Sequence, residues 1–154
     1  MQRRGKGILH TMSPELIEAT RREWRELGFF YDNSESGWRF VGSKAGLLAF
    51  ASLLRKYSQN PKNAGLSEHD HLGPYMYLKL VTWTLPEITA DGIAGKSDDF
   101  SRLAQLLESA VQTASLSSSF IISDQYQRNC QYPLRFEVKD DGCDPASFDA
   151  ALTK

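Results

Sequence analysis

Residues 38–54 read WRFVGSKAGLLAFASLL, and residues 92–107 read GIAGKSDDFSRLAQLL. Each stretch begins with a short strand-like run, breaks at a glycine and continues with leucines at helical spacing. Sequence that predicts further strands follows each of them. We therefore expect a β-α-β-β unit to occur twice, as an internal repeat over residues 38–84 and 92–139.

The first third of the chain contains residues that mark where a helix and two strands begin and end. Aromatic and β-branched residues flank a cluster of turn-forming residues at 33–37, which predicts a hairpin over residues 29–41. Ahead of it, Ser13 followed by Pro14 predicts the N-cap of a helix that ends at Gly28. This region is therefore expected to run helix, strand, strand.

Two later segments predict strands. Hydrophobic and charged residues alternate at 134–138, which is the clearest strand pattern of the chain. Residues 75–83 alternate as well, and the face that carries Leu78 and Leu80 is the expected core face. Together these patterns predict a single α+β domain over residues 13–154, with three helices and a largely antiparallel sheet of six to seven strands.

The composition is that of an ordinary globular protein: 154 residues, of which 41% are hydrophobic and 24% charged. A chain of that size can form one stable domain without disulfides or metals. The net charge is −1, so nucleic acid is not an expected partner. The only basic cluster, Arg3, Arg4 and Lys6, lies in residues 1–12, where we expect a disordered N-terminal extension.

The chain has no run of 18 apolar residues, so a membrane is not an expected partner either. Residues 1–12 lack the apolar region of a signal peptide, which predicts a cytoplasmic location. Cys130 and Cys143 lack the spacing of a metal site and are too few for a disulfide framework. We expect both to be reduced thiols.

The segment from Glu68 to Tyr75 reads EHDHLGPY and holds two of the three histidines. His69 and His71 are two residues apart, so an extended chain would place both imidazoles on one side, as in metal sites on strands. A zinc or similar divalent ion would need a third ligand, and the candidates are Asp91, Asp124, Asp140 and Asp141. The alternative interpretation is that both histidines hydrogen-bond to backbone groups.

An ion held by these histidines with a vacant position could activate water. A metal-dependent hydrolase centred on His69 and His71 is therefore one functional hypothesis. No general base is identified beside them, and no serine or cysteine stands in a recognisable nucleophile setting. The sequence accordingly favours a protein without catalytic activity and without a cofactor.

The same region supplies the candidate binding residues Glu68, Asp70, Tyr75 and Tyr77. With Trp83 and Trp38, the two tyrosines could line an exposed aromatic face that anchors a protein partner. The favoured interpretation of these aromatic residues is different: they form a second core layer beneath the N-terminal helix, beside Trp24.

The rhythm of strand, glycine, leucine-rich helix and strand over residues 38–77 and 92–138, with the acidic-histidine segment, resembles small bacterial immunity-protein-like domains found beside polymorphic toxins. Glu68–Tyr75 together with residues 140–145 also resembles a group of short uncharacterised bacterial proteins. These resemblances imply a bacterial origin and a protein-binding role, and they carry over no catalytic residue.

Three functional hypotheses follow. The first is a non-enzymatic bacterial protein of the immunity type that binds a protein partner through a surface including residues 68–77. The second is the hydrolase centred on His69 and His71. The third is a purely structural or self-associating protein, for example a homodimer.

Overall fold

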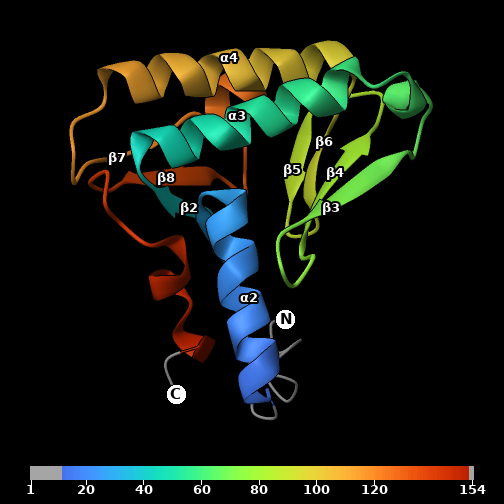
Figure 1. Ribbon diagram of the computed structural model, residues 1–154. Coiled ribbons are helices and arrows are strands. Elements are labelled where there is room, and N and C mark those ends of the chain that lie inside the picture. The colour runs from blue at the N-terminus through green and yellow to red at the C-terminus, as the bar shows by residue number, and fades with distance from the viewer. Residues whose placement is uncertain (1–11, 153–154) are drawn as a thin grey trace.

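The computed structural model describes residues 12–152 of the chain (Figure 1). Its helices are α2 (Pro14–Leu27), α3 (Lys44–Gln59), α4 (Ser97–Thr113) and α5 (Ser123–Tyr126), with the short 3-10 helices η1 (Pro61–Ala64), η2 (Pro145–Phe148) and η3 (Ala150–Leu152). Its strands are β1 (Phe30–Ser34), β2 (Gly37–Gly42), β3 (His69–Leu72), β4 (Leu78–Thr82), β5 (Glu87–Thr89), β6 (Gly92–Gly95), β7 (Ser119–Ile121) and β8 (Leu134–Val138). Of the extension predicted at residues 1–12, only Met12 lies within the described residues, and it is partly buried against the core.

The strands form two four-stranded sheets: sheet A in the order β1-β2-β8-β7 and sheet B in the order β3-β4-β6-β5. Each sheet joins two antiparallel hairpins through a central parallel pair, β2 with β8 and β4 with β6. The α+β class is confirmed, but the prediction of one sheet with six to seven strands and three helices was wrong. The chain crosses between sheets at each long helix, because α3 leads from β2 to the β3–β4 hairpin and α4 leads from β6 to the β7–β8 hairpin. Hydrophobic periodicity identifies strands but not their partners, so it could not reveal this crossing.

The two sheets have the same register around their parallel pairs. In sheet A, Gly42 at the end of β2 lies beside Val138, and in sheet B, Gly95 at the end of β6 lies beside Thr82. Two residues before these glycines, Phe40 lies beside Phe136 in sheet A, and Ile93 lies beside Leu80 in sheet B. The order strand, strand, helix, strand, strand occurs twice along the chain. An internal repeat in the sequence remains a prediction.

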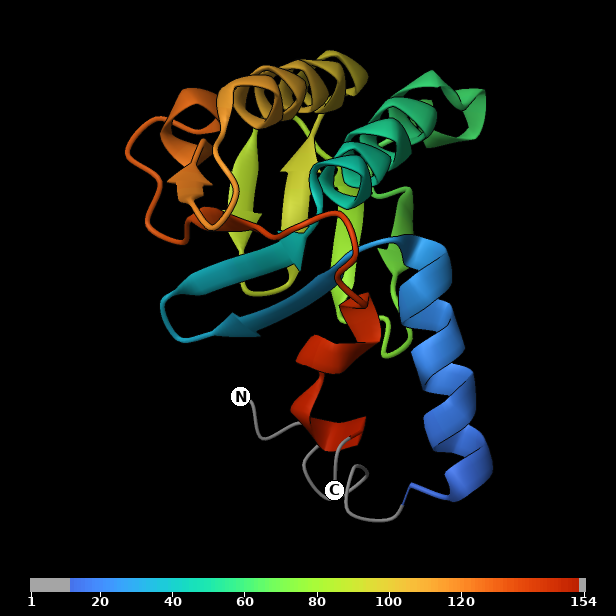
Figure 2. The ribbon, with the colours of Figure 1, turned by 60° about the vertical axis from the view of Figure 1, so that its left-hand side comes forward.

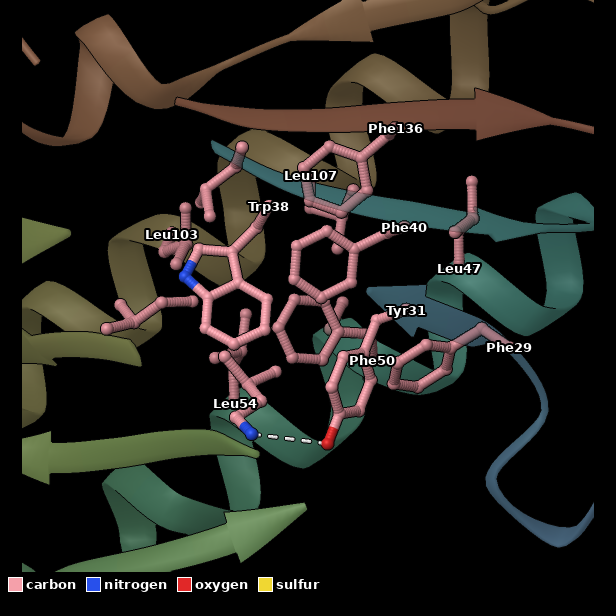
Figure 3. Packing of buried hydrophobic residues seen from close by; sticks show 14 of the residues in the cluster. Phe29, Tyr31, Trp38, Phe40, Leu47, Phe50, Leu54, Leu103, Leu107 and Phe136 are labelled. Atoms are coloured by element: carbon pink, nitrogen blue, oxygen red, sulfur yellow. Dashed lines mark hydrogen bonds between the residues drawn. The ribbon is translucent and has the colours of Figure 1, made fainter. Parts of the chain in front are cut away.

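The core lies between the sheets and the helices α3 and α4, which run side by side across one face of both sheets (Figures 1 and 2). It is strongly aromatic. The ring of Phe40 stacks on those of both Phe50 and Phe136, with centroid distances of 4.7 and 4.8 Å, and these two rings lie 6.3 Å from each other (Figure 3). All three side chains are 0% exposed. Burial of each contributes roughly 1.5–3 kcal/mol, so this stack is a major part of the stability.

Helix α2 begins and ends as predicted. The Ser13 side chain accepts a hydrogen bond from the backbone N–H of Leu16, and Gly28 adopts the left-handed conformation with φ 97° at the C-cap. Its N-terminal end lies away from the sheets, and the helix runs toward them beside the C-terminal segment (Figure 1). No helix in residues 12–152 is long and apolar enough to cross a membrane.

The strand predicted at 75–83 needs correction: it begins at Leu78, because Gly73 and Met76 turn the chain with positive φ. Residues 69–72 ahead of it form strand β3. Residues 87–95 form the β5–β6 hairpin.

Candidate functional site

Strand β3 is the terminal strand of sheet B in the described chain (Figure 1). The backbone N–H of Thr82 donates to the carbonyl of Glu68 (2.8 Å), so the even-numbered residues of this hairpin direct their backbone groups toward each other. On β4, the N–H groups of Lys79 and Trp83 turn the opposite way, toward the β6 side of the sheet. The backbone N–H and C=O groups of His69 and His71 are therefore directed away from the sheet.

The other edge of sheet B is covered. The N–H of Ile88 in β5 donates to the side-chain amide oxygen of Gln127 (2.8 Å), and the indole N–H of Trp38 donates to the carbonyl of Thr89 (2.7 Å). The Gln127 side chain, which follows α5, thus occupies an outward backbone N–H at which another strand would pair. Sheet B therefore presents β3, rather than β5, as its accessible edge.

The predicted metal ligands His69 and His71 are exposed and lie on one side of β3, with ring centroids 5.2 Å apart. Each Nδ1 lies within hydrogen-bonding distance of a backbone carbonyl, that of Ser67 (3.0 Å) or Met76 (3.1 Å). This matches the alternative interpretation of the two histidines. Within residues 12–152, no group of three His, Cys, Asp or Glu residues is arranged to hold a metal, so none of the four candidate aspartates completes a site. Binding of zinc here remains a prediction.

The acidic candidates differ in their surroundings. Glu68 is exposed, and its carbonyl also accepts a hydrogen bond from the Tyr57 hydroxyl (2.7 Å). Asp70 lies on the opposite face of β3 from the histidines, with a carboxylate oxygen 3.7 Å from the ammonium of Lys62. An exposed pair at this distance is a weak interaction. Of the two, Glu68 is the freer to meet a partner.

Tyr75 belongs to the layer beneath α2. Its hydroxyl donates to a carboxylate oxygen of Asp149 (2.6 Å), which also accepts from the indole N–H of Trp24 (2.9 Å). Its ring lies 6.1 Å from that of Trp24 and stacks on Tyr77 at 5.4 Å. Burial, together with the hydrogen bond to Asp149, raises the pKa of Tyr75. The favoured interpretation of a second aromatic layer is thus seen for Tyr75.

The remaining aromatic candidates differ in their exposure to solvent. Trp38 is 1% exposed and belongs to the core, whereas Trp83 is 44% exposed. Asp149, 6% exposed, was missed from the sequence because nothing around it signals burial. Ala146 and Leu152 of the C-terminal segment are buried as well.

The face of sheet B that points away from α3 and α4 is open to solvent. We call it the open face, and its residues form two rows across the sheet in the strand order β3, β4, β6, β5: His69, Val81, Ala94, Glu87 and His71, Lys79, Gly92, Thr89. The outer strands contribute exposed side chains, and Val81 and Ala94 at the centre stay partly exposed. The other side of the same strands carries the buried residues Leu80 and Ile93.

The open face contains a shallow trough of about 270 Å³. Small residues, Gly92 and Ala94, form its floor, while Lys79, Val81 and Trp83 line one side and the acidic residues Glu87 and Asp91 line the other. Gly92 is required by geometry: its φ is 151°, and a Cβ there would lie 1.9 Å from the carbonyl oxygen of Lys79. The trough is therefore asymmetric, with large and basic side chains on β4 and small or acidic ones on β6 and β5.

A second hollow of about 480 Å³ lies where β4 and β6 end and α4 begins. Leu66 and Thr84 line it together with Lys96, Ser97 and Asp98. The carboxylate of Asp98 opposes binding of an anion at this helix start, and no buried unpaired polar atom among the described residues lines the hollow. The hollow extends the exposed surface of sheet B without defining a chemistry.

Comparison with protein families, curated proteins and solved structures finds no match for this chain.

Proposed function

We propose that this protein is a non-enzymatic binding module of the immunity type, and that it holds a protein partner through the free edge of β3. The observation that carries the proposal is the outward direction of the backbone groups of His69 and His71 at the end of sheet B. An extended segment of a partner would add to this edge as a further strand.

The surroundings of the edge suit a protein partner. Exposed apolar side chains flank β3 on both sides: Leu66 precedes it and Met76 follows it, with 58% and 57% exposure. Glu68, also exposed, adds an acidic group at the start of the strand. Backbone hydrogen bonds would supply affinity, and these flanking side chains would supply selectivity among partner sequences.

Edge strands are usually shielded, because an uncovered edge invites pairing with other chains. The two edges of sheet B differ in this respect, since the Gln127 side chain occupies the outward N–H of Ile88 in β5. An edge left open beside one that is covered supports a binding role for β3.

We also infer that the two β-β-α-β-β halves of the chain arose as a repeat. The matching registers around Gly42 and Gly95 support this inference. A repeat would make the surfaces of the two sheets equivalent by origin, so that their differences reflect different uses.

The test is proline substitution on the free edge. Proline at position 71 removes an outward N–H without removing a bond between β3 and β4, whereas His71→Ala removes only the side chain. Proteins would be captured from an extract of the cells that carry the gene, with tagged wild type, His71→Ala or His71→Pro as bait. We expect one protein to be retained by wild type and His71→Ala and lost with His71→Pro. Equal capture by His71→Pro would overturn strand addition at β3.

A further inference from the structure

The open face of sheet B has a pattern that complements itself. We propose that a second copy of this chain packs face to face on it, related by a twofold axis that runs parallel to the strands between β4 and β6. This site is separate from the free edge of β3, so the inference does not depend on the proposed partner there.

The steric part of the argument rests on the two rows of the open face. A twofold axis between β4 and β6 places each β4 residue opposite the β6 residue of the same row in the second copy. Val81 then meets Ala94 of the second copy, and Lys79 lies over Gly92 of the second copy. Large side chains face small ones at both positions, and the symmetry repeats each contact.

The polar part follows from the same axis, which sets β3 of one copy over β5 of the other. His69 then lies opposite Glu87 of the second copy, and His71 opposite Thr89. The ammonium of Lys79 reaches toward Asp91 of the second copy, because both residues line the trough beside Gly92. Each imidazole thus meets an acceptor, and the basic side of each face meets the acidic side of the other.

Sheet A shows what a covered face of this kind contains. On its outer face Phe30 and Val41 occupy the positions that Glu87 and Ala94 occupy in sheet B. They are buried beneath Trp24 and the C-terminal segment around Phe148. The described chain offers no such segment to sheet B, and a second sheet at the usual packing distance of about 10 Å would fill the same role.

The interface would be small. Four strands spaced about 4.8 Å apart span only about 15 Å. Even with Trp83 and Leu85 at the rim, the contact falls below the standard size of specific interfaces, which is about 800 Å² per partner. We therefore expect a dimer with a dissociation constant in the micromolar range.

Sedimentation equilibrium of the full chain, from about 1 to 500 μM to bracket that constant, tests the proposal. We expect wild type to approach twice the chain mass of 17.3 kDa as concentration rises. Ala94→Arg, which places a large charged side chain at the centre of the face, should remain monomeric. Arg135→Glu reverses a charge on the outer face of sheet A, at the position that Lys79 occupies in sheet B, and should dimerise as wild type does.

A charge exchange keeps the test valid if Ala94→Arg folds poorly. Lys79→Glu and Asp91→Lys should each weaken self-association at least tenfold, because each sets like charges against each other in both symmetric contacts. An equimolar mixture of the two variants should restore the dimer, since both contacts again join opposite charges. A monomeric wild type at every concentration would overturn the proposal. So would a dimer that Ala94→Arg leaves intact and His71→Pro abolishes, because copies would then pair edge to edge.

Discussion

The outer face of sheet A carries Phe30 and Val41, which are 5% and 0% exposed, while at matching positions sheet B carries an exposed Glu87 and a partly exposed Ala94. The two faces share their strand order and register but not their environment. The chain itself covers the β1–β2 part of the outer face of sheet A, and it gives sheet B no such cover among residues 12–152. One backbone arrangement thus serves the core or the surface according to a few side chains.

Several polar contacts hold the C-terminal segment and α2 together over the outer face of sheet A. The carboxylate of Asp149 joins the C-terminal segment to Trp24 and Tyr75, and the Asp144 carboxylate accepts two hydrogen bonds from the guanidinium of Arg25 (2.9 and 3.1 Å). Phe148 then lies with its ring 6.3 Å from that of Phe30. The open face of sheet B has no counterpart to these contacts among residues 12–152, so the two faces should respond differently to substitution.

The largest difference should appear between two tryptophans. Trp24→Ala removes a side chain that is 1% exposed and uncovers Phe30, and we expect it to lower the free energy of unfolding by about 3–5 kcal/mol. Trp83→Ala acts on the rim of the open face and should cost about 1 kcal/mol or less. Urea unfolding of both variants measures this. Equal losses would show that Trp83 is as important to the fold as Trp24.

A smaller difference should separate two glycines. Gly92→Ala places a Cβ against the carbonyl of Lys79 at a φ that L residues rarely adopt, so we expect a loss of about 2–4 kcal/mol. Gly142→Ala is the matched control, because nothing lies within 4 Å of the added carbon, and it should stay within about 0.5 kcal/mol of wild type. Thermal unfolding of the two variants measures this difference in stability. A neutral Gly92→Ala would mean that the floor of the trough is not fixed by this close approach.

The smallest effect should come from the ion pair between Asp144 and Arg25, which joins the C-terminal segment to α2. Hydrogen bonding to Arg25 lowers the pKa of Asp144. A carboxyl group with a depressed folded pKa contributes stability above its unfolded pKa of about 3.9, and the contribution is lost as pH falls through the folded value. Asp144→Asn should therefore be slightly less stable than wild type at pH 7, with the difference shrinking below about pH 4. The exposed Asp141→Asn serves as control, and melting curves that differ by the same amount at pH 7 and pH 3 would contradict the account.

Much of the fold could be predicted from local signals. Ser13 with Pro14 marks the start of α2, Gly28 marks its end, and the alternation at 134–138 marks β8, because caps and alternation are properties of short segments. The division into two sheets could not be predicted, since it depends on which hairpin each helix delivers to which partner. Periodicity contains no information on that choice.

The site was predicted in outline only. The sequence directs attention to residues 68–77 and to the alternation of Lys79, Val81 and Trp83. It does not indicate that Gly92 and Ala94 lie beside Lys79 and Val81, because that contact comes from the parallel pairing of β4 with β6. The burial of Asp149 likewise depends on contacts with α2 that are more than 120 residues away in sequence.

Carboxyl labelling followed by mass spectrometry tests most directly whether the open face of sheet B is covered by another molecule while sheet A is covered by its own chain. The reagent would be applied to the full chain at low and high concentration. We predict that labelling of Glu87 and Asp91 falls as the protein is concentrated, while labelling of Asp32 on the outer face of sheet A stays constant. Constant labelling at all three residues, or a decrease confined to Asp32, would contradict the account.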